Sequence, residues 1–418
     1  MAPNSSPKLA ASTRRTSREL FNAHSWPCCS LLECQRSARS NSLLRRDILR
    51  RAEELDDSDP LNPALIDPPP YVDFMDTYCR HLRQLIVDGI NHPRIRTQPL
   101  SGFKICVDAG NGNGGFFARN VLALLGADVS GSVLLDPDGT FPMHSPNPED
   151  SDAVEYASNA TTLAGADLGI VFDTDVDRSC LIARDGTIIN RNLLIALLSA
   201  VVLRENPGAT IVTDSVTSSG LSDFIASLGG THLRYKRGYK NVINKGQELN
   251  ENGTNVPLMI ETSGHGAMRE NYYLDDGAYL AVKLVIEAVR RRVNGEGELE
   301  ELLNGLRQPA EAKEARMKVL SNDFTSAGSD VIEEFREKAS NDWGWRVAEE
   351  NFEGYRFNID VGGQKTGWVL LRASLHDPLL VLNAESEAYG SMDTITKPIK
   401  QWLESEKADV VDASPLAS

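Results

Sequence analysis

Three aspartates at alternating positions carry the clearest chemical signal in this sequence. Asp173, Asp175 and Asp177 follow an apolar run at 169–172, and Arg178 comes directly after them. Carboxylates so close together repel one another unless a cation lies between them. Mg²⁺ prefers oxygen ligands and leaves room for a phosphate oxygen, and arginine binds the same anion. The pattern therefore predicts a magnesium site with Arg178 beside it, and a solvated acidic turn is the plainer alternative.

A carboxylate, a hydroxyl and an imidazole follow a second apolar run. This run ends at Ile260, and Glu261, Ser263 and His265 come within the next five residues. Carboxylate and hydroxyl groups hydrogen-bond to the hydroxyls of a sugar, and histidine exchanges protons near neutral pH. The segment predicts a sugar-binding loop with His265 as an acid or base. The alternative is a surface loop with an incidental histidine.

A basic turn lies between these two motifs. Residues 235–240 place Arg237, Tyr239 and Lys240 around a glycine. In an acidic protein such a local cluster of cations indicates an anion site, and an ordinary solvated basic turn is the alternative.

A second candidate anion site closes a strand-like run near the C-terminus. Arg372, Ser374 and His376 precede Pro378. Their side chains, together with free backbone N–H groups, predict a phosphate-binding loop. The alternative is a plain connection between two strands, ended by the proline.

A glycine-rich turn follows Asp108. Its spacing, Gly110-x-Gly112-x-Gly114-Gly115, differs from the dinucleotide pattern G-x-G-x-x-G, and no acidic residue ends a second strand about 20 residues later. We therefore interpret it as a tight strand-to-helix connection in which glycine supplies a positive φ, rather than as a nucleotide site.

Alternating strand-like and helix-like segments must position these motifs. The predicted strands span 104–108, 169–172, 210–214 and 257–260, and the predicted helices span 72–90, 116–125, 190–204, 219–228 and 278–292. Such alternation predicts an α/β fold with parallel sheets whose strands carry ligand sites at their carboxyl ends.

The C-terminal part follows a different pattern. Its predicted strands span 355–361, 368–372 and 379–382, and a helical pattern covers 394–404. These segments predict a small α+β domain with an antiparallel sheet. Residues 309–318, rich in charge and alanine, are predicted to form the linker that precedes it.

Composition limits the partners and the compartment. The 418 residues carry a net charge of −16, which opposes binding to nucleic acid and to anionic membranes. No apolar stretch of about 18 residues is present to span a membrane. Cys106 and Cys180 lie in apolar runs and are predicted to be core residues. The other cysteines lack the spacing of a zinc site. This use of cysteine favours a reducing compartment. Residues 1–42 suit a plastid transit peptide or a disordered tail of a cytoplasmic protein, not a secretory signal.

The order of these motifs resembles the α-D-phosphohexomutase superfamily, which includes phosphoglucomutase, phosphomannomutase and phosphoglucosamine mutase. Residues 172–178 are similar to its metal loop, residues 261–265 to its sugar-binding loop and residues 372–378 to its phosphate loop. The amino-acid sequences of residues 373–378 and 146–149 are similar to those of the plant, algal and cyanobacterial branch of the superfamily.

The resemblance implies consecutive α/β/α domains with mixed, mostly parallel sheets, and a C-terminal α+β domain. The implied division is 43–100 for a remnant of the first domain, 101–207 for the second, 208–310 for the third and 311–418 for the fourth.

The resemblance also implies a reaction and a set of ligands. A phosphoserine exchanges its phosphoryl group with a hexose phosphate, so that hexose 1-phosphate and hexose 6-phosphate interconvert through a hexose 1,6-bisphosphate. Asp173, Asp175 and Asp177 would hold Mg²⁺, and Arg178 and His265 would act at the reacting atoms. The implied substrate ligands are Arg237, Tyr239, Lys240, Glu261, Ser263, Arg372, Ser374 and His376.

The family segment that carries the phosphoserine, Thr-Ala-Ser-His-Asn-Pro, does not occur in this sequence. Only 101 residues precede Gly102, where the family carries a whole additional domain. We therefore expect most of the first domain to be missing, and a chain of this sequence to be nearly inactive.

Two other functions stay open on the sequence. A chain with metal and substrate loops but no phosphoserine suits a non-catalytic sugar-phosphate-binding protein. Residues 171–176 also fit the start of haloacid-dehalogenase-type phosphatases, in which Asp173 would be the nucleophile and Asp175 the acid or base. The sequence contains no pattern that indicates which hexose is bound or which oligomeric state the protein adopts.

Overall fold

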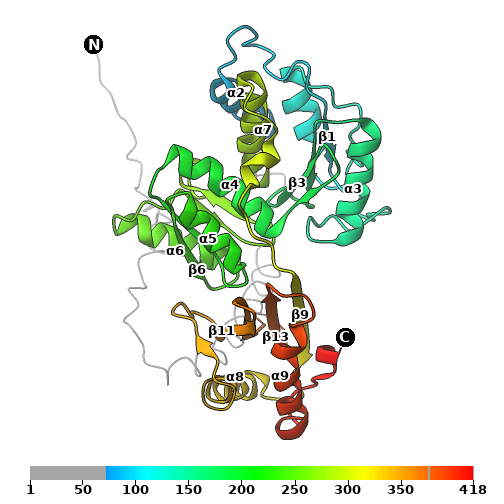
Figure 1. The fold of residues 1–418 in the computed structure, drawn as a ribbon. Coiled ribbons are helices and arrows are strands. Elements are labelled where there is room, and N and C mark those ends of the chain that lie inside the picture. Colours follow the sequence, from blue (N-terminus) through cyan, green and yellow to red (C-terminus); the bar gives the residue numbers. More distant parts are fainter. Residues whose placement is uncertain (1–71, 375–376, 418) are drawn as a thin grey trace, which may run out of the picture. The chain divides into compact units, whose positions relative to one another are not determined.

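The structure is a computed structural model that describes residues 72–374 and 377–417 (Figure 1). The predicted N-terminal segment 1–42, residues 43–71 of the predicted first-domain remnant and the predicted ligand His376 lie outside the described residues. The first described helix, α2 (Phe74–Ile90), confirms the helix predicted at 72–90.

Four strands form the first sheet, in the order β1-β2-β3-β4. They are β1 (Ile105–Asp108), β2 (Leu168–Phe172), β3 (Ser179–Ala183) and β4 (Ile188–Ile189). β1 and β2 pair in parallel, and the two other pairings are antiparallel. Every residue of β2 is buried, which explains why its sequence is an uninterrupted apolar run. The three aspartates leave the carboxyl end of this buried strand.

Helical segments cover this sheet. Helix α3 (Ser151–Ala164) contacts β1, β2 and β3. The helix predicted at 116–125 is present as a π-helical segment (Phe117–Leu122) followed by a 3-10 turn (Ala123–Leu125). Gly126 ends it with a φ of 93°, the left-handed conformation in which glycine commonly terminates helices.

The second sheet has the order β6-β5-β7-β8. Its strands are β5 (Thr210–Asp214), β6 (Thr231–Tyr235), β7 (Leu258–Ile260) and β8 (Gly266–Met268), and its helices are α4 (Arg191–Glu205), α5 (Ser219–Ser227), α6 (Tyr239–Glu251) and α7 (Gly277–Asn294). β5 pairs in parallel with both β6 and β7, whereas β8 is antiparallel to β7. The basic turn after β6 and the sugar-loop motif after β7 therefore leave the same edge of the sheet.

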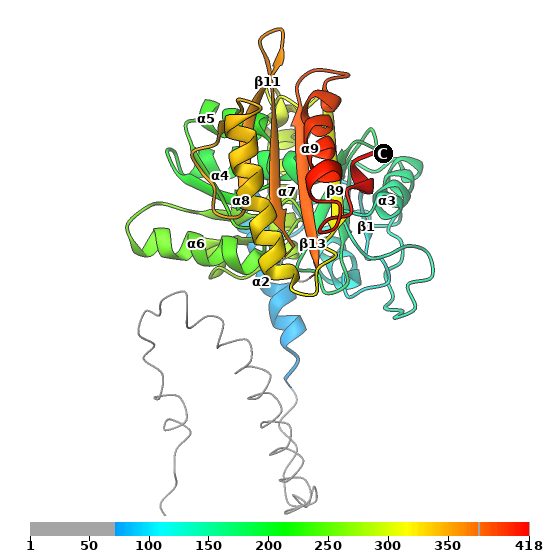
Figure 2. The same cartoon turned by 90° about the horizontal axis from the view of Figure 1, so that it is seen from below.

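The C-terminal sheet is antiparallel throughout, as predicted, with the order β10-β11-β12-β13-β9. Its strands are β9 (Glu311–Lys318), β10 (Arg346–Val347), β11 (Tyr355–Gly362), β12 (Lys365–Ala373) and β13 (Leu379–Ser386). Helices α8 (Phe324–Asn341) and α9 (Met392–Glu406) pack on one face of this sheet (Figure 2).

The predicted linker at 309–318 is wrong, because residues 311–318 form the edge strand β9. β9 pairs with β13 along its whole length, from Glu311 opposite Ser386 to Lys318 opposite Leu379. Ala315 and Met317 are buried, while the charged residues next to them face outward. The alternation of small or apolar residues with charged ones is thus a strand pattern of period two.

The predicted fold class is confirmed, because α/β units with mixed sheets precede a C-terminal α+β unit. The first sheet is less parallel than predicted, since two of its three pairings are antiparallel. The predicted core cysteines, Cys106 and Cys180, are buried. Within the described ranges, no helix has both the length and the apolar character needed to cross a membrane.

Candidate functional site

The loop after β2 gathers three carboxylates. One oxygen from each of Asp173, Asp175 and Asp177 lies within 4.8 Å of the others. Among the described residues, Asp177 Oδ1 is one of the few buried side-chain atoms without a hydrogen-bond partner. Burial and the neighbouring Asp173 carboxylate raise the pKa of Asp177 to about 7. An oxygen-rich cluster with an unsatisfied buried acceptor fits a hard divalent cation.

The backbone of this loop is strained and supported from outside. Val176 has a φ of 72°, which a β-branched residue rarely adopts. The N–H of Gly277, at the start of α7, donates to the carbonyl of Val176 at 3.0 Å. A Cβ at Gly277 would lie 2.6 Å from the carbonyl carbon of Arg178, so only glycine allows α7 to come this close.

The glycine-rich turn after β1 supports the same loop from the other side. Gly110 has a φ of 53°, which agrees with the predicted tight turn. The N–H of Asn113 donates to the carbonyl of Thr174 at 2.8 Å, between the first two aspartates. Gly112 packs so closely that a Cβ there would lie 2.6 Å from the carbonyl oxygen of Thr174. The turn thus positions the carboxylates.

Arg178 is held beside the carboxylates by three hydrogen bonds. Its N–H and Nε donate to the two oxygens of Asp173 at 3.1 and 2.9 Å. Its Nη1 donates to Oδ1 of Asn147 at 3.1 Å. The guanidinium is therefore fixed next to the predicted metal loop, where an anion bound to the metal would meet it.

His265 reaches the same place from the second sheet. Its backbone pairs with that of Arg178 in an isolated bridge, and its Nδ1 lies 2.8 Å from Oδ2 of Asp275 and 3.5 Å from Oδ2 of Asp177. Its ring stacks on that of Tyr239, with centroids 4.9 Å apart. Burial lowers the pKa of His265, but the carboxylates of Asp275 and Asp177 together outweigh burial and raise it.

Glu261 and Ser263 lie in the buried part of the sugar-loop motif, at 4% and 8% exposure. Oε1 of Glu261 accepts the N–H of Gly238 at 2.6 Å, which ties this motif to the basic turn. Ser263 Oγ lies 3.5 Å from Oε2 of Glu261. Burial, with a contribution from Asp214, raises the pKa of Glu261 to about 7.

The predicted cationic ligands differ in burial. Arg237 is half-buried. Burial lowers its pKa, but the carboxylates of Asp214, Glu149 and others raise it by more, so the net pKa is raised. Arg372 is buried at 5% exposure, and its Nε has no hydrogen-bond partner among the described residues. Lys240 is exposed, with its Nζ 5.8 Å from the centre of the Tyr239 ring.

Ser374 follows the end of β12. Its N–H donates to the carbonyl of Leu379 at 2.8 Å, and its Oγ accepts the N–H of Asp377 at 3.4 Å. Of the predicted phosphate loop, the structure thus describes Arg372 within β12, Ser374 after its end, and Asp377 and Pro378 before β13, whereas residues 375–376 lie outside the described residues.

Two domains of one protein family match this sequence. One is described as phosphoglucomutase/phosphomannomutase alpha/beta/alpha domain II and matches residues 76–186, and the other is domain III of the same proteins and matches residues 190–309. The chain belongs to the phosphoglucomutase/phosphomannomutase family. This agrees with the resemblance to the α-D-phosphohexomutase superfamily found in the motifs.

Individual relatives of this chain support the same family. It is 31% identical to a phosphoglucomutase of Neisseria meningitidis, over 72% of this chain and 61% of that protein. It is 30% identical to a phosphomannomutase of Escherichia coli, over 64% of this chain and 58% of that protein. A phosphoglucomutase/phosphomannomutase family protein of Burkholderia thailandensis superposes with a TM-score of 0.63 at 27% identity, over 79% of this chain and 65% of the other. The chain thus spans about three fifths of the length of the curated relatives it matches.

A cavity opens between the loops of this family member. It has a volume of about 210 Å³ and is lined by Arg237 and Thr262 of the second sheet, by Arg191 at the start of α4, and by Asn383 of β13. Oδ1 of Asn383 is buried and lacks a hydrogen-bond partner among the described residues. The cavity therefore brings the cations of Arg191 and Arg237 together with the carboxylates of Glu149, Glu314 and Glu385 next to the predicted substrate loops.

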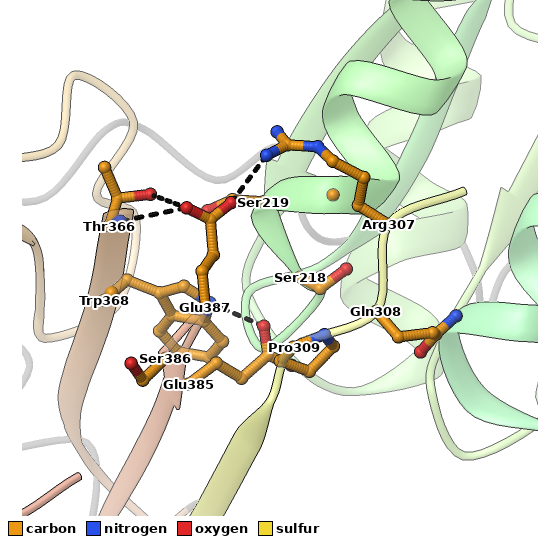
Figure 3. A pocket seen from close by; sticks show the side chains of 12 residues that line it. Ser218, Ser219, Arg307, Gln308, Pro309, Thr366, Trp368, Glu385, Ser386 and Glu387 are labelled. Carbon is orange, nitrogen blue, oxygen red and sulfur yellow. Dashed lines mark hydrogen bonds and ion pairs between the residues drawn. The ribbon is translucent and has the colours of Figure 1, made fainter. Parts of the chain in front are cut away.

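A second, smaller pocket lies between the C-terminal sheet, the start of α5 and residues 307–309. Figure 3 shows Glu387 joining Arg307 and Thr366, with distances of 2.7 Å to Arg307 Nη1 and 2.9 Å to Thr366 Oγ1. Nearby, the indole N–H of Trp368 donates to Glu385 at 2.8 Å. The volume of this pocket, about 20 Å³, is enough for a water molecule but too small for a hexose phosphate.

The structure adds three residues for which the sequence predicted no role in the site. Asn147 holds Arg178, Asp275 orients His265, and Glu353, in the connection between β10 and β11, accepts the N–H of Arg237 at 3.0 Å. Asn147 stands between two prolines, which marks a turn, and Asp275 belongs to an Asp-Asp pair before a helix. Nothing in the sequence around Glu353 connects it to Arg237, because that contact is tertiary.

Glu261 is expected to make the stability of the protein depend on pH. Its pKa of about 7 exceeds the usual 4.5, so between these values the folded state binds a proton that the unfolded state lacks. Stability should therefore fall as pH rises from about 5 to about 8, and Glu261→Gln should remove on the order of 2 kcal/mol of that fall. Urea unfolding of the wild type and the variant at about pH 5 and about pH 8 measures this fall in the free energy of unfolding. The exposed Glu349→Gln variant should keep the wild-type slope, and an unchanged slope in Glu261→Gln would contradict the raised pKa.

Proposed function

We propose that this chain carries the metal-binding and substrate-binding parts of a phosphohexomutase site, which interconverts hexose 1-phosphate and hexose 6-phosphate. One observation carries the proposal. The unsatisfied buried Oδ1 of Asp177 lies in a cluster of three carboxylates, and Arg178 and His265 are fixed beside that cluster. Phosphoryl transfer needs mainly positioning and neutralisation of charge, and this arrangement offers both.

Asp173, Asp175 and Asp177 would hold Mg²⁺, which when bound supplies positive charge to the phosphoryl oxygens. Arg178 is placed to bind the same oxygens from one side. His265 is oriented through Nδ1 by Asp275, so its Nε2 is the nitrogen left to exchange a proton with a sugar oxygen. The raised pKa of His265 favours the protonated form, which can donate to the leaving oxygen.

The remaining predicted residues would bind the hexose phosphate. Glu261 and Ser263 present a carboxylate and a hydroxyl to sugar hydroxyls, and Arg372 offers an unpaired N–H to a phosphate. Arg237, Tyr239, Lys240, Ser374 and His376 complete the proposed ligand set. The reaction would pass through a hexose 1,6-bisphosphate, and the phosphoserine it requires has no counterpart in the printed sequence. A polypeptide of this sequence is therefore expected to bind hexose phosphate but to turn it over very slowly.

A coupled assay and a binding measurement test the proposal together. With Mg²⁺ and glucose 1,6-bisphosphate supplied, we expect little conversion of glucose 1-phosphate to glucose 6-phosphate. We expect calorimetry to show binding of glucose 6-phosphate, weakened at least about tenfold by Arg372→Ala, because a charge-assisted hydrogen bond is lost. Arg96→Ala, at an exposed arginine of the α2–β1 connection, is the control. Absence of binding would refute the proposal, and turnover abolished by Asp175→Ala would mean that another residue carries the phosphoryl group.

One structural observation weighs against the phosphatase alternative. Asp173 would be its nucleophile, but the side chain is 2% exposed and both of its oxygens accept hydrogen bonds from Arg178. A nucleophilic carboxylate needs a free oxygen aimed at the substrate. Non-catalytic binding of sugar phosphate is the outcome in which glucose 6-phosphate binds and no turnover follows, even when a phosphoserine donor is supplied.

A further inference from the structure

Glu353 joins the C-terminal sheet to the loops of the second sheet. It lies in the connection between β10 and β11, and one of its oxygens, Oε1, accepts both the hydroxyl of Ser215 and the N–H of Arg237, the latter at 3.0 Å. Ser215 directly follows β5, and Arg237 belongs to the basic turn after β6. A single carboxylate thus bridges two neighbouring strand ends.

The basic turn depends on this contact for its shape. The next N–H along the chain, that of Gly238, donates to Glu261 at 2.6 Å. Two consecutive amides of the turn are therefore held by two carboxylates, one from the C-terminal sheet and one from the sugar-loop motif. Gly238 has a φ of 108°, and as the N-cap of α6 it has no side chain to close the turn. Glu261 thus bonds the N-cap amide, as the N3 side chain does in a capping box, and Glu353 bonds the amide before it. Asn241 Nδ2 donates to the carbonyl of Arg237 at 2.7 Å.

The charge of Glu353 also acts on the predicted phosphate ligand Arg372. Burial lowers the pKa of Arg372, and Glu353 is the foremost carboxylate that opposes this shift. The same carboxylate thus bonds the main chain of one predicted anion ligand and attracts the charged side chain of the other.

Docking of the C-terminal sheet does not rest on Glu353 alone. Arg356 of β11 donates through Nη1 to the carbonyls of Ser215 and Thr217 at 3.0 and 2.9 Å, and its guanidinium lies 3.7 Å from the centre of the Trp368 ring. Loss of Glu353 therefore leaves the sheet attached through Arg356 and removes one contact to the turn and one to Ser215. This separation makes the contribution of Glu353 measurable.

We propose that Glu353 is a positioning residue that holds the basic turn in the shape required to bind a phosphorylated hexose. Affinity for the substrate then depends on a contact made by the C-terminal sheet, although Glu353 itself does not touch the substrate. The substrate class in this inference rests on the proposed function, whereas the effect on the turn does not.

The experiment compares Glu353→Ala, Glu353→Gln and Glu349→Ala. Glu349 is an exposed glutamate on the same connection, so its replacement changes the charge equally without touching the turn. Calorimetry with glucose 6-phosphate and Mg²⁺ should show a loss of affinity of at least about tenfold in Glu353→Ala. Glu353→Gln should restore most of it, because an amide oxygen still accepts the N–H of Arg237. The Glu349→Ala variant should bind as the wild type does.

Hydrogen exchange without ligand separates this inference from the proposed function. The amide of Arg237 should exchange at least about tenfold faster in Glu353→Ala than in the wild type, and at the wild-type rate in Glu349→Ala. Unchanged exchange and unchanged affinity in Glu353→Ala would overturn the inference, and so would equal losses in both alanine variants. If exchange responds as expected but the wild type binds no glucose 6-phosphate, the positioning role stands and the substrate class is wrong.

Discussion

Replacement of Asp175 with asparagine is expected to abolish the stabilisation that Mg²⁺ gives this protein. Asp175 is exposed, whereas Asp173 is buried and bonded to Arg178, so the substitution removes a proposed metal ligand without opening the core. At a Mg²⁺ concentration of about 100 times the dissociation constant, a bound ion stabilises the folded state by about 3 kcal/mol. Without Mg²⁺ the variant should be slightly more stable than the wild type, because one of three mutually repelling charges is gone.

Urea unfolding with Mg²⁺ or with a chelator measures this difference. The exposed Asp330→Asn variant, on α8, makes the same chemical change away from the loop and should keep the full response to Mg²⁺. An Asp175→Asn variant that responds to Mg²⁺ as strongly as the wild type would exclude the loop as the metal site.

Gly112→Ala is expected to disrupt the metal loop from outside it. The new Cβ would lie 2.6 Å from the carbonyl oxygen and 2.8 Å from the Cα of Thr174, and both are backbone atoms that cannot turn away. Overpacking of this kind costs about 3 kcal/mol when the neighbour must move. Because Thr174 lies between Asp173 and Asp175, any shift that relieves the clash also changes the spacing of the carboxylates.

The control for this variant is Gly139→Ala. A Cβ at Gly139 would meet no atom within 4 Å, and this residue is exposed with no positive φ. Urea unfolding should show destabilisation for Gly112→Ala and none for Gly139→Ala, and calorimetry with Mg²⁺ should show weaker binding in the first variant alone. Normal Mg²⁺ affinity in Gly112→Ala would mean that the glycine-rich turn does not support the loop.

The sequence was most informative where the signal is local. The buried strand β2 and the aspartates that follow it lie within ten residues, so hydrophobicity and spacing sufficed to predict them. The same holds for the turn at Gly110 and for α7. These elements carry their own patterns of apolar residues, turn residues and capping groups.

Prediction failed where a partner strand decides the structure. In residues 311–318 charged side chains outnumber apolar ones, and the segment is a strand because β13 supplies its hydrogen bonds and a core receives Ala315 and Met317. Helix α6 was missed for a similar reason, since Val242, Ile243 and Gly246 form only a narrow buried face. The contacts of Asn147, Asp275 and Glu353 could not be predicted, because each joins residues from different elements.

The supports of Arg178 also bear on how the protein folds. Its side chain bonds Asn147, its backbone pairs with His265, and Gly277 closes on the loop from almost a hundred residues further along the chain. Contacts of such long range form only after the loop-closure entropy between them has been lost. We therefore expect the loop to reach its final geometry late in folding, after both sheets have formed. Tight uptake of Mg²⁺ during refolding should then report the last folding step.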